Sequence, residues 1–525
     1  MGIDSIDNAA RGYSPGSPDQ VSEMSHVLQS HPGVRGVAVL RSEQSGWVAF
    51  IEPNDTYLDE VLERNKARDL ALHRWRKSFD LTQFTQSAKS NPVGLNIQGW
   101  NSSYTGQELP EAEMLEWVQL TVSEILGFAP RAAYEIGCGT GMLLLRVAPT
   151  CQRYVAIDFS PATLDRVRAQ LKSVPTLERS VELLERMADD FNGFDQNSFD
   201  TVILNSVAQF FPSSSYLTQV LEGAIEIVRP GGRVFAGDIQ SLPLRGPFLS
   251  SVELFRSDDD LTQTAIIDRI LRRVRLEPWL FVSPAYFLKL ARRHKKLSRV
   301  EIEPRLGRAD NEVTRYRYNA ILYVGEPSEQ RNDFPFEDWR ERRWDLKEIR
   351  ELLEKQTGPF GIKSIPNSRV ELDMAGLDEL RRGDDSVTAG NLKRKLTQAA
   401  THGIHPQDLV DLVKSVGGLQ IRLSWAACRR DGSYDAAFFH AHSLESSTSQ
   451  SICWPQPEPS EYLTLTSWPR QSKLRSDLIE QISVLCKNSL PSELMPAGFY
   501  LVDTLPHEVD QLLVARAIDR LNSLG

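Results

Sequence analysis

The chain has 525 residues, of which 41% are hydrophobic and 25% charged, a composition typical of a globular protein with several domains. Its 60 basic and 70 acidic residues give a net charge of −10, which argues against a protein that tracks nucleic-acid phosphates. The sequence has no apolar run of about 18 residues and no secretory pattern at its start. We therefore expect a cytoplasmic protein without a membrane span.

The N-terminal part predicts a small mixed unit. After a polar lead-in over residues 1–20, residues 21–30 show helical spacing. Residues 34–40 and 47–51 resemble two strands joined by a turn. Residues 57–79 are charged, with apolar side chains at helical spacing, and this pattern indicates a connecting helix.

The central part alternates helices and strands. Helical spacing occurs at residues 111–126, 142–148, 162–173 and 216–228. Strand patterns occur at residues 132–136, 154–157, 199–205 and 233–239. This alternation is typical of parallel βαβ units, so we expect an α/β fold with a doubly wound, Rossmann-like, mostly parallel sheet. Residues 254–296 are mostly helical and basic in their second half, which predicts a helical cap, and two late strands follow at 300–302 and 316–324.

The composition shifts to Pro, Glu, Asn and Asp around residues 327–334, which predicts a domain boundary. Beyond it we expect three short helices, at residues 346–357, 370–381 and 387–400. We also expect a hairpin whose two strands are residues 419–425 and 436–440. A Ser/Pro/Gln-rich linker follows over residues 443–461, and the last segment predicts a helix, a strand at 498–502 and a final helix. These parts suggest a small α+β accessory domain.

The five cysteines are widely separated and form no CxxC pair or zinc pattern with histidine. Two close histidine pairs, His402/His405 and His440/His442, lie in loop-like stretches and have no third ligand beside them in the sequence. We therefore expect a reduced protein without a metal site.

The most specific motif lies between the strand at 132–136 and the next helix. Gly137, Gly139 and Gly141 let the backbone turn tightly and approach a ligand closely. Met142 follows, so the motif is GxGxG rather than the dinucleotide pattern GxGxxG, which favours an adenosyl cofactor without a pyrophosphate. Asp158 ends the next strand, where a carboxylate can accept both ribose hydroxyls and suits a sulfonium charge. The alternatives are a glycine turn without a ligand and a dinucleotide site.

Two other features have open interpretations. Asp189 and Asp190 precede the strand at 199–205 and could reach an adenine amino group, or they could form a solvated loop. The basic stretches at 272–275 and 292–296 are either solvated helix faces or a contact surface for an acidic carrier protein or a phosphopantetheine arm. The turn at 230–232 is expected to be structural.

Several motifs resemble one family. The stretches GWNSSYTG (99–106), EIGCGTG (135–141), NSVAQFFP (205–212) and GDI (237–239) resemble class I S-adenosylmethionine-dependent methyltransferases. They are most similar to the N-methyltransferase domains embedded in nonribosomal peptide synthetases, whose C-terminal portion is matched by IPNSR (365–369), LSW (423–425) and DGS (431–433). Residues 27–40 and 490–506 resemble the two ends of the small C-terminal subdomain of an adenylation domain, which the methyltransferase interrupts in synthetases.

The resemblance also has departures. The large adenylation core is absent, and residues 507–511 (HEVDQ) replace the short turn that carries the family's adenylating lysine. We therefore expect the flanks to be a scaffold or a docking surface. Gln240 stands where the family usually has arginine, and Ser283 where it usually has an acidic residue. Both departures bear on the identity of the methyl acceptor more than on the cofactor.

The resemblance implies a division into five parts. They are residues 1–60 (first half of the adenylation-type subdomain), 61–90 (helical connector), 91–326 (methyltransferase with a cap at 250–297), 327–442 (C-terminal accessory portion) and 443–525 (linker and second half of the subdomain).

The resemblance further implies S-adenosyl-L-methionine as cofactor. The expected cofactor-binding residues are Glu135, Gly137, Cys138, Gly139, Gly141, Asp158, Phe159, Asp189, Asp190 and Asn205. Four neutral side chains are expected to orient the amine and the sulfonium in catalysis, namely Asn101, Tyr104, Asn205 and Gln209. Each has a structural alternative: a turn residue for Asn101 and Asn205, a residue packed on the sheet for Tyr104, and a solvated helix face for Gln209.

The expected function is N-methylation of an aminoacyl or peptidyl intermediate in nonribosomal-peptide-type secondary metabolism, with a carrier protein or synthetase as partner. One alternative is a methyltransferase for a free amino acid or small amine. Another is a methyltransferase fold without catalytic activity that serves as an interaction module. Nucleic acids and membranes are not expected as partners.

Overall fold

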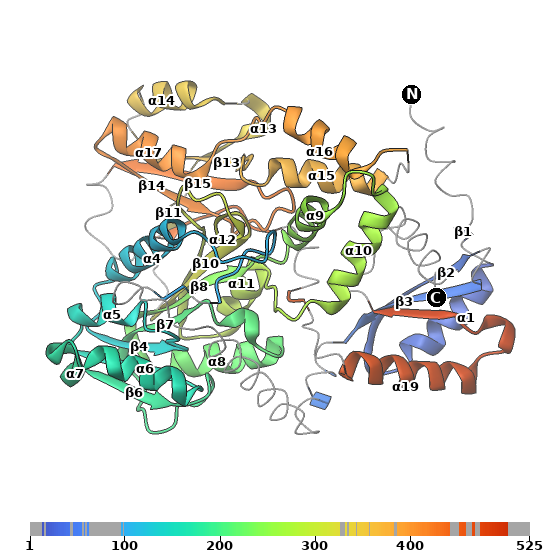
Figure 1. Ribbon diagram of the computed structural model, residues 1–525, viewed down its shortest axis with the longest axis horizontal. Helices are drawn as coiled ribbons and strands as arrows, with labels where there is room; N and C mark the ends of the chain where they lie inside the picture. Colours follow the sequence, from blue (N-terminus) through green and yellow to red (C-terminus); the bar gives the residue numbers. More distant parts are fainter. Residues whose placement is uncertain are drawn as a thin grey trace.

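The computed structural model places the chain in three sheet-based parts (Figure 1). The residues that it describes are 13–14, 17–42, 46–54, 57, 60–61, 96–97, 99–325, 331–332, 335–342, 344–355, 358–382, 386–440, 451–457, 465–467 and 473–501. Among these residues, no helix combines the length and the apolar character that crossing a lipid bilayer would require.

The largest sheet has seven strands in the order β6-β5-β4-β7-β8-β10-β9. Their bounds are Val181–Glu185 (β6), Arg153–Asp158 (β5), Ala132–Ile136 (β4), Phe199–Asn205 (β7), Val228–Gln240 (β8), Arg317–Val324 (β10) and Leu297–Pro304 (β9). The first five strands, from β6 to β8, are parallel to one another. Strand β10 runs antiparallel to both β8 and β9. The expected α/β fold with a doubly wound, mostly parallel sheet is confirmed.

Helices cover both faces of this sheet. They are α4 (Glu111–Leu126), α5 (Leu144–Val147), α6 (Pro161–Leu171), α7 (Pro175–Ser180) and α8 (Ser214–Ile227). Successive side chains of the inner strands point alternately into two apolar cores. In β5, Tyr154 packs with α4, α5 and α6, whereas Val155 packs with α8 on the other face. Strands that are apolar on both faces in this way are typical of parallel sheets between helical layers.

A helical cap and the accessory part lie beyond β8. The cap holds α9 (Arg245–Arg256), α10 (Gln263–Leu276) and α11 (Pro284–Arg293), and α12 (Glu312–Tyr316) precedes β10. The accessory sheet has the order β12-β13-β15-β14, with bounds Phe336–Asp338, Phe360–Ile365, Tyr434–His440 and Leu419–Ser424. Its helices are α13 (Trp339–Arg342), α14 (Leu346–Lys355), α15 (Glu371–Arg382), α16 (Ala389–Gln398) and α17 (Pro406–Val416).

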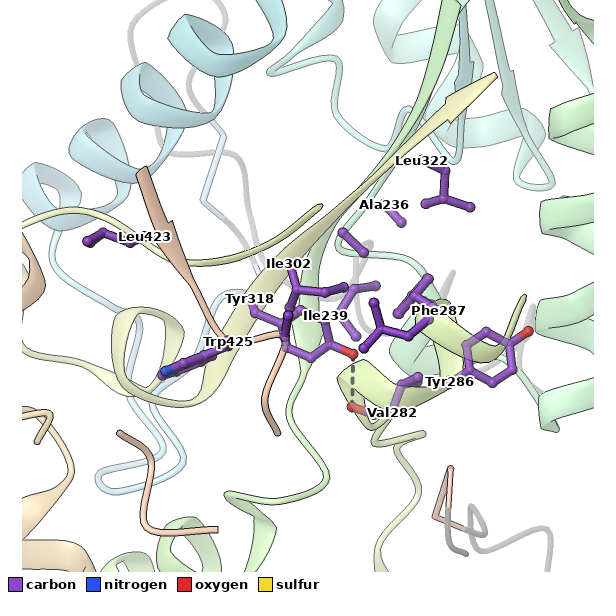
Figure 2. Close-up of a cluster of buried hydrophobic side chains, with 14 of the residues drawn as sticks. Ala236, Ile239, Val282, Tyr286, Phe287, Ile302, Tyr318, Leu322, Leu423 and Trp425 are labelled. Carbon is purple, nitrogen blue, oxygen red and sulfur yellow. Dashed lines mark hydrogen bonds between the residues drawn. The ribbon is translucent and has the colours of Figure 1, made fainter. Parts of the chain in front are cut away.

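The accessory part shares its core with the large sheet. Figure 2 shows Trp425, which follows β14 directly, near Ile302 of β9 and Tyr318 of β10, with Leu423 of β14 farther from them. The Trp425 backbone N–H donates to the Ile302 carbonyl at 2.9 Å. The Tyr318 hydroxyl donates to the Val282 carbonyl at 3.0 Å, which ties the cap to β10. One continuous apolar cluster therefore holds the large sheet, the cap and the accessory sheet together.

The third sheet combines strands from distant parts of the chain. It has the order β1-β2-β3-β17, with bounds Tyr13–Ser14, Val34–Ser42, Gly46–Pro53 and Gly498–Leu501. Strand β17 lies parallel to β3, and the red strand beside the blue ones in Figure 1 shows this pairing. Helices α1 (Pro18–Gln29) and α19 (Lys473–Ser489) cover the sheet and share a buried core that includes Met24, Leu28 and Ile482.

The structure differs from several sequence-based expectations. Strand β6 was missed, because its alternation of Val181, Leu183 and Leu184 with glutamates is short and half exposed. Strand β13 and helix α17 were also missed. The helix expected at 142–148 is only the short α5, and the turn expected at 230–232 is a bulge within β8, where Gly231 has φ +84°. Part of the expected linker, Ser451–Ile452 (β16), pairs with Arg331–Asn332 (β11).

Some expectations lie outside the described residues. These are most of the polar lead-in, most of the connecting helix at 57–79, the motif at 507–511 and the final helix. The division into five parts with the boundaries given above stays a prediction.

Candidate active site

A cavity of about 790 Å³ opens at the carboxyl ends of the parallel strands. It is lined by residues that follow β4, β5, β7 and β8, together with the segment around residue 100, α12 and the loop between α10 and α11. The chain runs outward from β4 to β5 and β6 and then returns to β7, so the strand order reverses between β4 and β7. This switch point is where open α/β sheets bind their ligands.

The glycine loop forms one wall of the cavity. Gly137, Gly139 and Gly141 have φ values of +70°, +51° and +82°, which favour glycine. A Cβ at Gly137 would lie 2.6 Å from Cγ2 of Val207, so this position is closed to larger residues. No atom lies within 4 Å of a Cβ built at Gly139, where the backbone faces open space. Gly137 and Gly139 line the cavity, whereas Gly141 does not.

Asp158 is fixed against this loop. Its Oδ2 accepts a hydrogen bond from the Gly139 N–H at 3.0 Å, and its Oδ1 accepts from the Ser160 N–H at 2.9 Å. The side chain is buried, lines the cavity and ends β5. The neighbouring Phe159 lines the cavity as well. A carboxylate held in this place can accept the two hydroxyls of a ribose.

Glu135 supplies a second carboxyl group beside the loop. Burial raises the pKa of Glu135 to about 7, although the Tyr154 hydroxyl, which donates to its Oε2 at 2.8 Å, opposes that rise. Burial also raises the pKa of the Cys138 thiol, next to the carboxylate of Asp158. Cys138 is therefore a neutral thiol at physiological pH, and its contribution to the cavity is a small apolar surface.

The other half of the cavity holds three buried amide side chains, Asn205, Gln209 and Gln240. One polar atom of each side chain has no hydrogen-bond partner among the described residues, namely Asn205 Oδ1, Gln209 Oε1 and Gln240 Nε2. All three side chains line the cavity and are less than 9% exposed. These three atoms have almost no accessible surface, so they lie against other protein atoms, and other atoms of the same side chains line the cavity. We call this half, which also includes Arg317 and Glu312, the acceptor half.

The positions of the amides follow from the backbone. Gly237 lies beside Asn205 in the pairing of β7 with β8, and a Cβ there would be 2.2 Å from Asn205 Oδ1. Gln209 lies on the turn after β7, and its Nε2 donates to the Ser206 carbonyl at 2.8 Å. Its Oε1 atom is buried against the protein.

A buried ion pair stabilises the same edge of the sheet. Arg317 Nη1 lies 2.7 Å from Asp238 Oδ2, and the Ser206 hydroxyl donates to the same oxygen. Asp238 sits on a bulge of β8 with φ +60°, which turns its side chain toward β10. Burial acts to raise the pKa of Asp238, but Arg317 and Arg305 outweigh it and hold this pKa below its ordinary value.

The segment around residue 100 closes the acceptor half. Both oxygens of Glu312 accept from the Ser103 N–H, at 3.0 and 2.9 Å, and Oε1 also accepts from the Ser103 hydroxyl at 2.8 Å. Trp100 packs on Trp117 of α4, with ring centroids 4.7 Å apart. Asn101 lines the cavity and forms an isolated antiparallel bridge with Glu108.

Several expected site residues do not line the cavity. The Tyr104 hydroxyl lies 2.8 Å from Ser251 Oγ and 3.1 Å from Tyr316 Oη, so Tyr104 joins the cap to α12 instead of facing a ligand. Asp189 Oδ1 accepts from the Tyr216 hydroxyl at 2.8 Å, and only Tyr216 reaches the cavity. Asp190 accepts from Asn192. At that end Met187 and Ala188 form the wall.

The sequence reasoning also missed cavity residues. Glu312, Arg317 and Trp279 come from α12, β10 and the loop before α11, which no local motif connects to the glycine loop. Gln240 was noticed only as a departure at the end of β8. Its place beside Arg317 follows from the antiparallel pairing of β8 with β10.

Known proteins are similar to the chain both in its central part and along most of its length. A family described as "Methyltransferase domain" matches residues 134–234. The chain is 32% identical to chondramide synthase from Chondromyces crocatus, over 95% of this chain and 13% of that protein. It is 28% identical to the beauvericin nonribosomal cyclodepsipeptide synthetase from Beauveria bassiana, over 92% of this chain and 16% of that protein. The chain thus spans a small part of the curated relatives, and the resemblance to synthetases is confirmed.

Among solved structures, the N-methyltransferase NodS from Bradyrhizobium japonicum, in complex with S-adenosyl-L-homocysteine, gives a TM-score of 0.28 at 15% identity, over 40% of this chain and 87% of that chain.

Proposed function

The chain carries an S-adenosylmethionine-dependent methyltransferase domain, and we propose that it methylates the amine of an aminoacyl or peptidyl acceptor in nonribosomal-peptide-type biosynthesis. The observation that carries this proposal is a single cavity lined both by the glycine loop with Asp158 and by the neutral amide side chains of Asn101, Asn205 and Gln209.

The cofactor half of the cavity suits S-adenosylmethionine. We assign Asp158 as the residue that accepts the ribose hydroxyls. We assign the backbone of Gly137 and Gly139 as the surface that the cofactor approaches closely. Two carboxyl groups, Glu135 and Asp158, line the cavity together with Arg166 and Arg186, so charges of both signs are available to a ligand that carries both a cation and a carboxylate. S-adenosylmethionine supplies a methyl group activated by the sulfonium charge. Met187 and Ala188 provide an apolar wall for a flat aromatic ring.

The acceptor half suits a neutral amine. Amide side chains are uncharged and carry both hydrogen-bond donors and acceptors, so Asn205 and Gln209 can line a site for a neutral amine without adding charge to it. An α-amino group has a pKa near 7.7–8.0, so a large fraction is neutral at physiological pH without a strong base. Holding the reacting atoms roughly 3 Å apart contributes about 7–11 kcal/mol to such a transfer. We keep Asn101 as a third orienting residue, because it lines the same half.

The synthetase relatives support an acceptor carried as a thioester on a carrier protein, although a free amino acid or small amine fits the same amides. The basic stretches of the cap are partly used inside the fold, since Arg273 pairs with Glu253 at 2.9 Å and Arg292 donates to Gln456. The remaining positive charge at 272–275 and 292–296 is our proposed contact for an acidic carrier protein.

The test is mass spectrometry of methyl transfer from isotope-labelled S-adenosylmethionine. The acceptor panel holds free amino acids, small amines and the same amino acids loaded on carrier proteins. Label on the nitrogen of carrier-bound acceptors supports the proposal, and label only on free compounds supports the small-molecule alternative. An absence of label together with an absence of S-adenosylmethionine binding would contradict both, and would favour a non-catalytic interaction module.

A further inference from the structure

Arg317 reaches the acceptor half with a guanidinium that is only partly used inside the protein. It begins β10, and its side chain is 8% exposed and lines the cavity. The Nη1 atom donates to Asp238 Oδ2 at 2.7 Å, whereas Nε and Nη2 have no hydrogen-bond partner among the described residues. In Arg245 and Arg305 an unpartnered Nε atom is fully buried, but the unpartnered nitrogens of Arg317 keep accessible surface. They are therefore open to a ligand in the cavity.

The surroundings hold this guanidinium in place before a ligand binds. The carboxylate of Asp238 is fully buried and also accepts from the Ser206 hydroxyl. The Cζ atom of Arg317 lies 6.0 Å from the centroid of the Trp100 ring, in the segment that closes the acceptor half. Because a guanidinium is planar, a bond through Nη1 leaves the edge formed by Nε and Nη2, which carries two parallel N–H groups. This edge is suited to a carboxylate or another ligand oxygen.

The place of Arg317 in the sheet assigns it to the acceptor. Strand β10 is separated from β4 and β5, which carry the glycine loop and Asp158, by β7 and β8. Two other arginines line the cavity beside the cofactor half, Arg166 on α6 and Arg186 directly after β6. Arg317 is thus the arginine of the cavity that lies farthest along the sheet from the cofactor loop, among the described residues.

The acceptor half also contains a carboxylate. Glu312 lines the cavity, and its oxygens accept three hydrogen bonds from Ser103. A cation and an anion in one half of the cavity are complementary to a ligand that has an amine at one position and an oxygen acceptor next to it. An amine beside an acyl group has this arrangement, whereas a simple alkylamine leaves the guanidinium without a partner.

We propose that Arg317 is a specificity-determining residue: its free Nε–Nη2 edge binds the oxygen of the acyl group next to the acceptor amine. Arg317 thereby selects α-aminoacyl compounds over amines that have no neighbouring acyl oxygen. The oxygen belongs either to a thioester carbonyl or to a free carboxylate, because both accept from a guanidinium. This inference rests on the proposed function and names the residue that recognises its class of acceptor.

The first test compares acceptors that differ in the acyl oxygen. The probes are the N-acetylcysteamine thioester of an amino acid, the free amino acid and the matching alkylamine. Arg317→Lys keeps a positive charge for Asp238 but has no planar edge with two N–H groups. We expect this variant to lower kcat/KM by about 10- to 100-fold for the acceptor with the acyl oxygen, and to leave the alkylamine value unchanged. The probe that suffers the larger loss identifies the thioester or the carboxylate as the source of the oxygen.

A matched control is Arg305→Lys. Arg305 is 2% exposed and also lowers the pKa of Asp238, but it does not line this cavity. The ratio of kcat/KM between thioester and alkylamine should therefore stay unchanged in this variant. Should Arg317→Lys fail to fold, the double variant Arg317→Gln with Asp238→Asn replaces the ion pair by two neutral side chains and leaves neither charge unpaired. It should lose the same selectivity.

A second measurement requires no turnover. Calorimetry gives the dissociation constant of S-adenosylhomocysteine, and then, with the protein saturated by it, that of the free amino acid and its amide. We expect Arg317→Lys to leave the first constant unchanged and to raise at least one of the others by about 10-fold.

Two outcomes would overturn the inference while leaving the proposed function intact. One is an equal loss of kcat/KM on the alkylamine. The other is weaker binding of S-adenosylhomocysteine with unchanged acceptor selectivity, which would assign Arg317 to the carboxylate of the cofactor. A protein that methylates none of the three probes and no carrier-bound acceptor would contradict the proposed function, and with it the inference.

Discussion

Asp238 and Arg317 face each other across the β8–β10 pair with their charged atoms 2.7 Å apart, and their side chains are 0% and 8% exposed. The contact depends on the bulge that gives Asp238 its positive φ, because a regular strand would direct this side chain differently. The pair thus links the two directions of the sheet, parallel on one side of β8 and antiparallel on the other, directly beside the acceptor half.

Removing one partner of this pair should leave a buried charge without compensation. We expect Asp238→Ala to lower the free energy of unfolding by about 3–5 kcal/mol. Asp378→Ala, which breaks the exposed i,i+3 pair of Asp378 with Arg381, should lower it by less than about 1 kcal/mol. Urea unfolding followed by circular dichroism measures both, and equal effects would show that burial of the first pair does not matter.

Asp158 should be required for cofactor affinity. Asp158→Asn keeps the size of the side chain but removes the charge, so we expect the dissociation constant of S-adenosylmethionine to rise by roughly 10- to 100-fold. The control is Asp165→Asn on α6, whose carboxylate is exposed and pairs with Arg168. Calorimetric titration gives both constants. Unchanged affinity of the Asp158 variant would remove this carboxylate from the proposed cofactor site.

The glycine loop allows a steric effect to be separated from a backbone effect. Ala at Gly137 combines an unfavourable positive φ with a Cβ only 2.6 Å from Val207, whereas Ala at Gly231 has a similar φ and nothing within 4 Å. We expect Gly231→Ala to destabilise the fold by about 1–2 kcal/mol and Gly137→Ala by about 1–3 kcal/mol more. Adding Val207→Ala to Gly137→Ala should restore part of the difference. Thermal unfolding of the three variants, with and without cofactor, would measure these differences in stability.

Glu135 should give the protein a defined pH dependence. Its pKa is raised from near 4.5 to about 7 by burial, so the folded state binds the proton more tightly than the unfolded state. Glu135 therefore contributes stability that is fully present below pH 4.5 and is lost as the pH rises through 7. In the unaltered protein this loss lowers the free energy of unfolding by about 3 kcal/mol between about pH 4.5 and 8, and Glu135→Gln should abolish it. Urea midpoints of both proteins from pH 4.5 to 8 test this, and parallel curves would contradict it.

The sequence was sufficient for the features that lie close together in the chain. The glycine loop and Asp158 belong to one βαβ unit, and their spacing alone predicted that they meet at the sheet edge. Asn205 could be placed because it ends a strongly apolar strand. Asp189 does not line the cavity itself, since its carboxylate accepts from the hydroxyl of Tyr216, which does, and its proposed contact with an adenine stays a prediction.

The features that could not be predicted depend on long-range packing. Arg317 and Glu312 reach the cavity only because β10 inserts between β8 and β9 in the antiparallel direction. Tyr104 lies near the site in the sequence pattern, but its hydroxyl is directed to Ser251 and Tyr316 by the cap. Gln240 reaches the cavity because the antiparallel pairing of β8 with β10 places it opposite Arg317.

The parallel pairing of β3 with β17 bears on the order in which the protein assembles during synthesis. Strand β3 leaves the ribosome before the large and accessory sheets, and β17 leaves after both. The intervening sheets form from strands that are closer in the chain, so they can fold first as units. Until β17 arrives, the β3 edge and the apolar surface that α19 later covers are exposed to other chains. The small sheet is therefore the step at which nascent chains are most prone to exchange strands and aggregate.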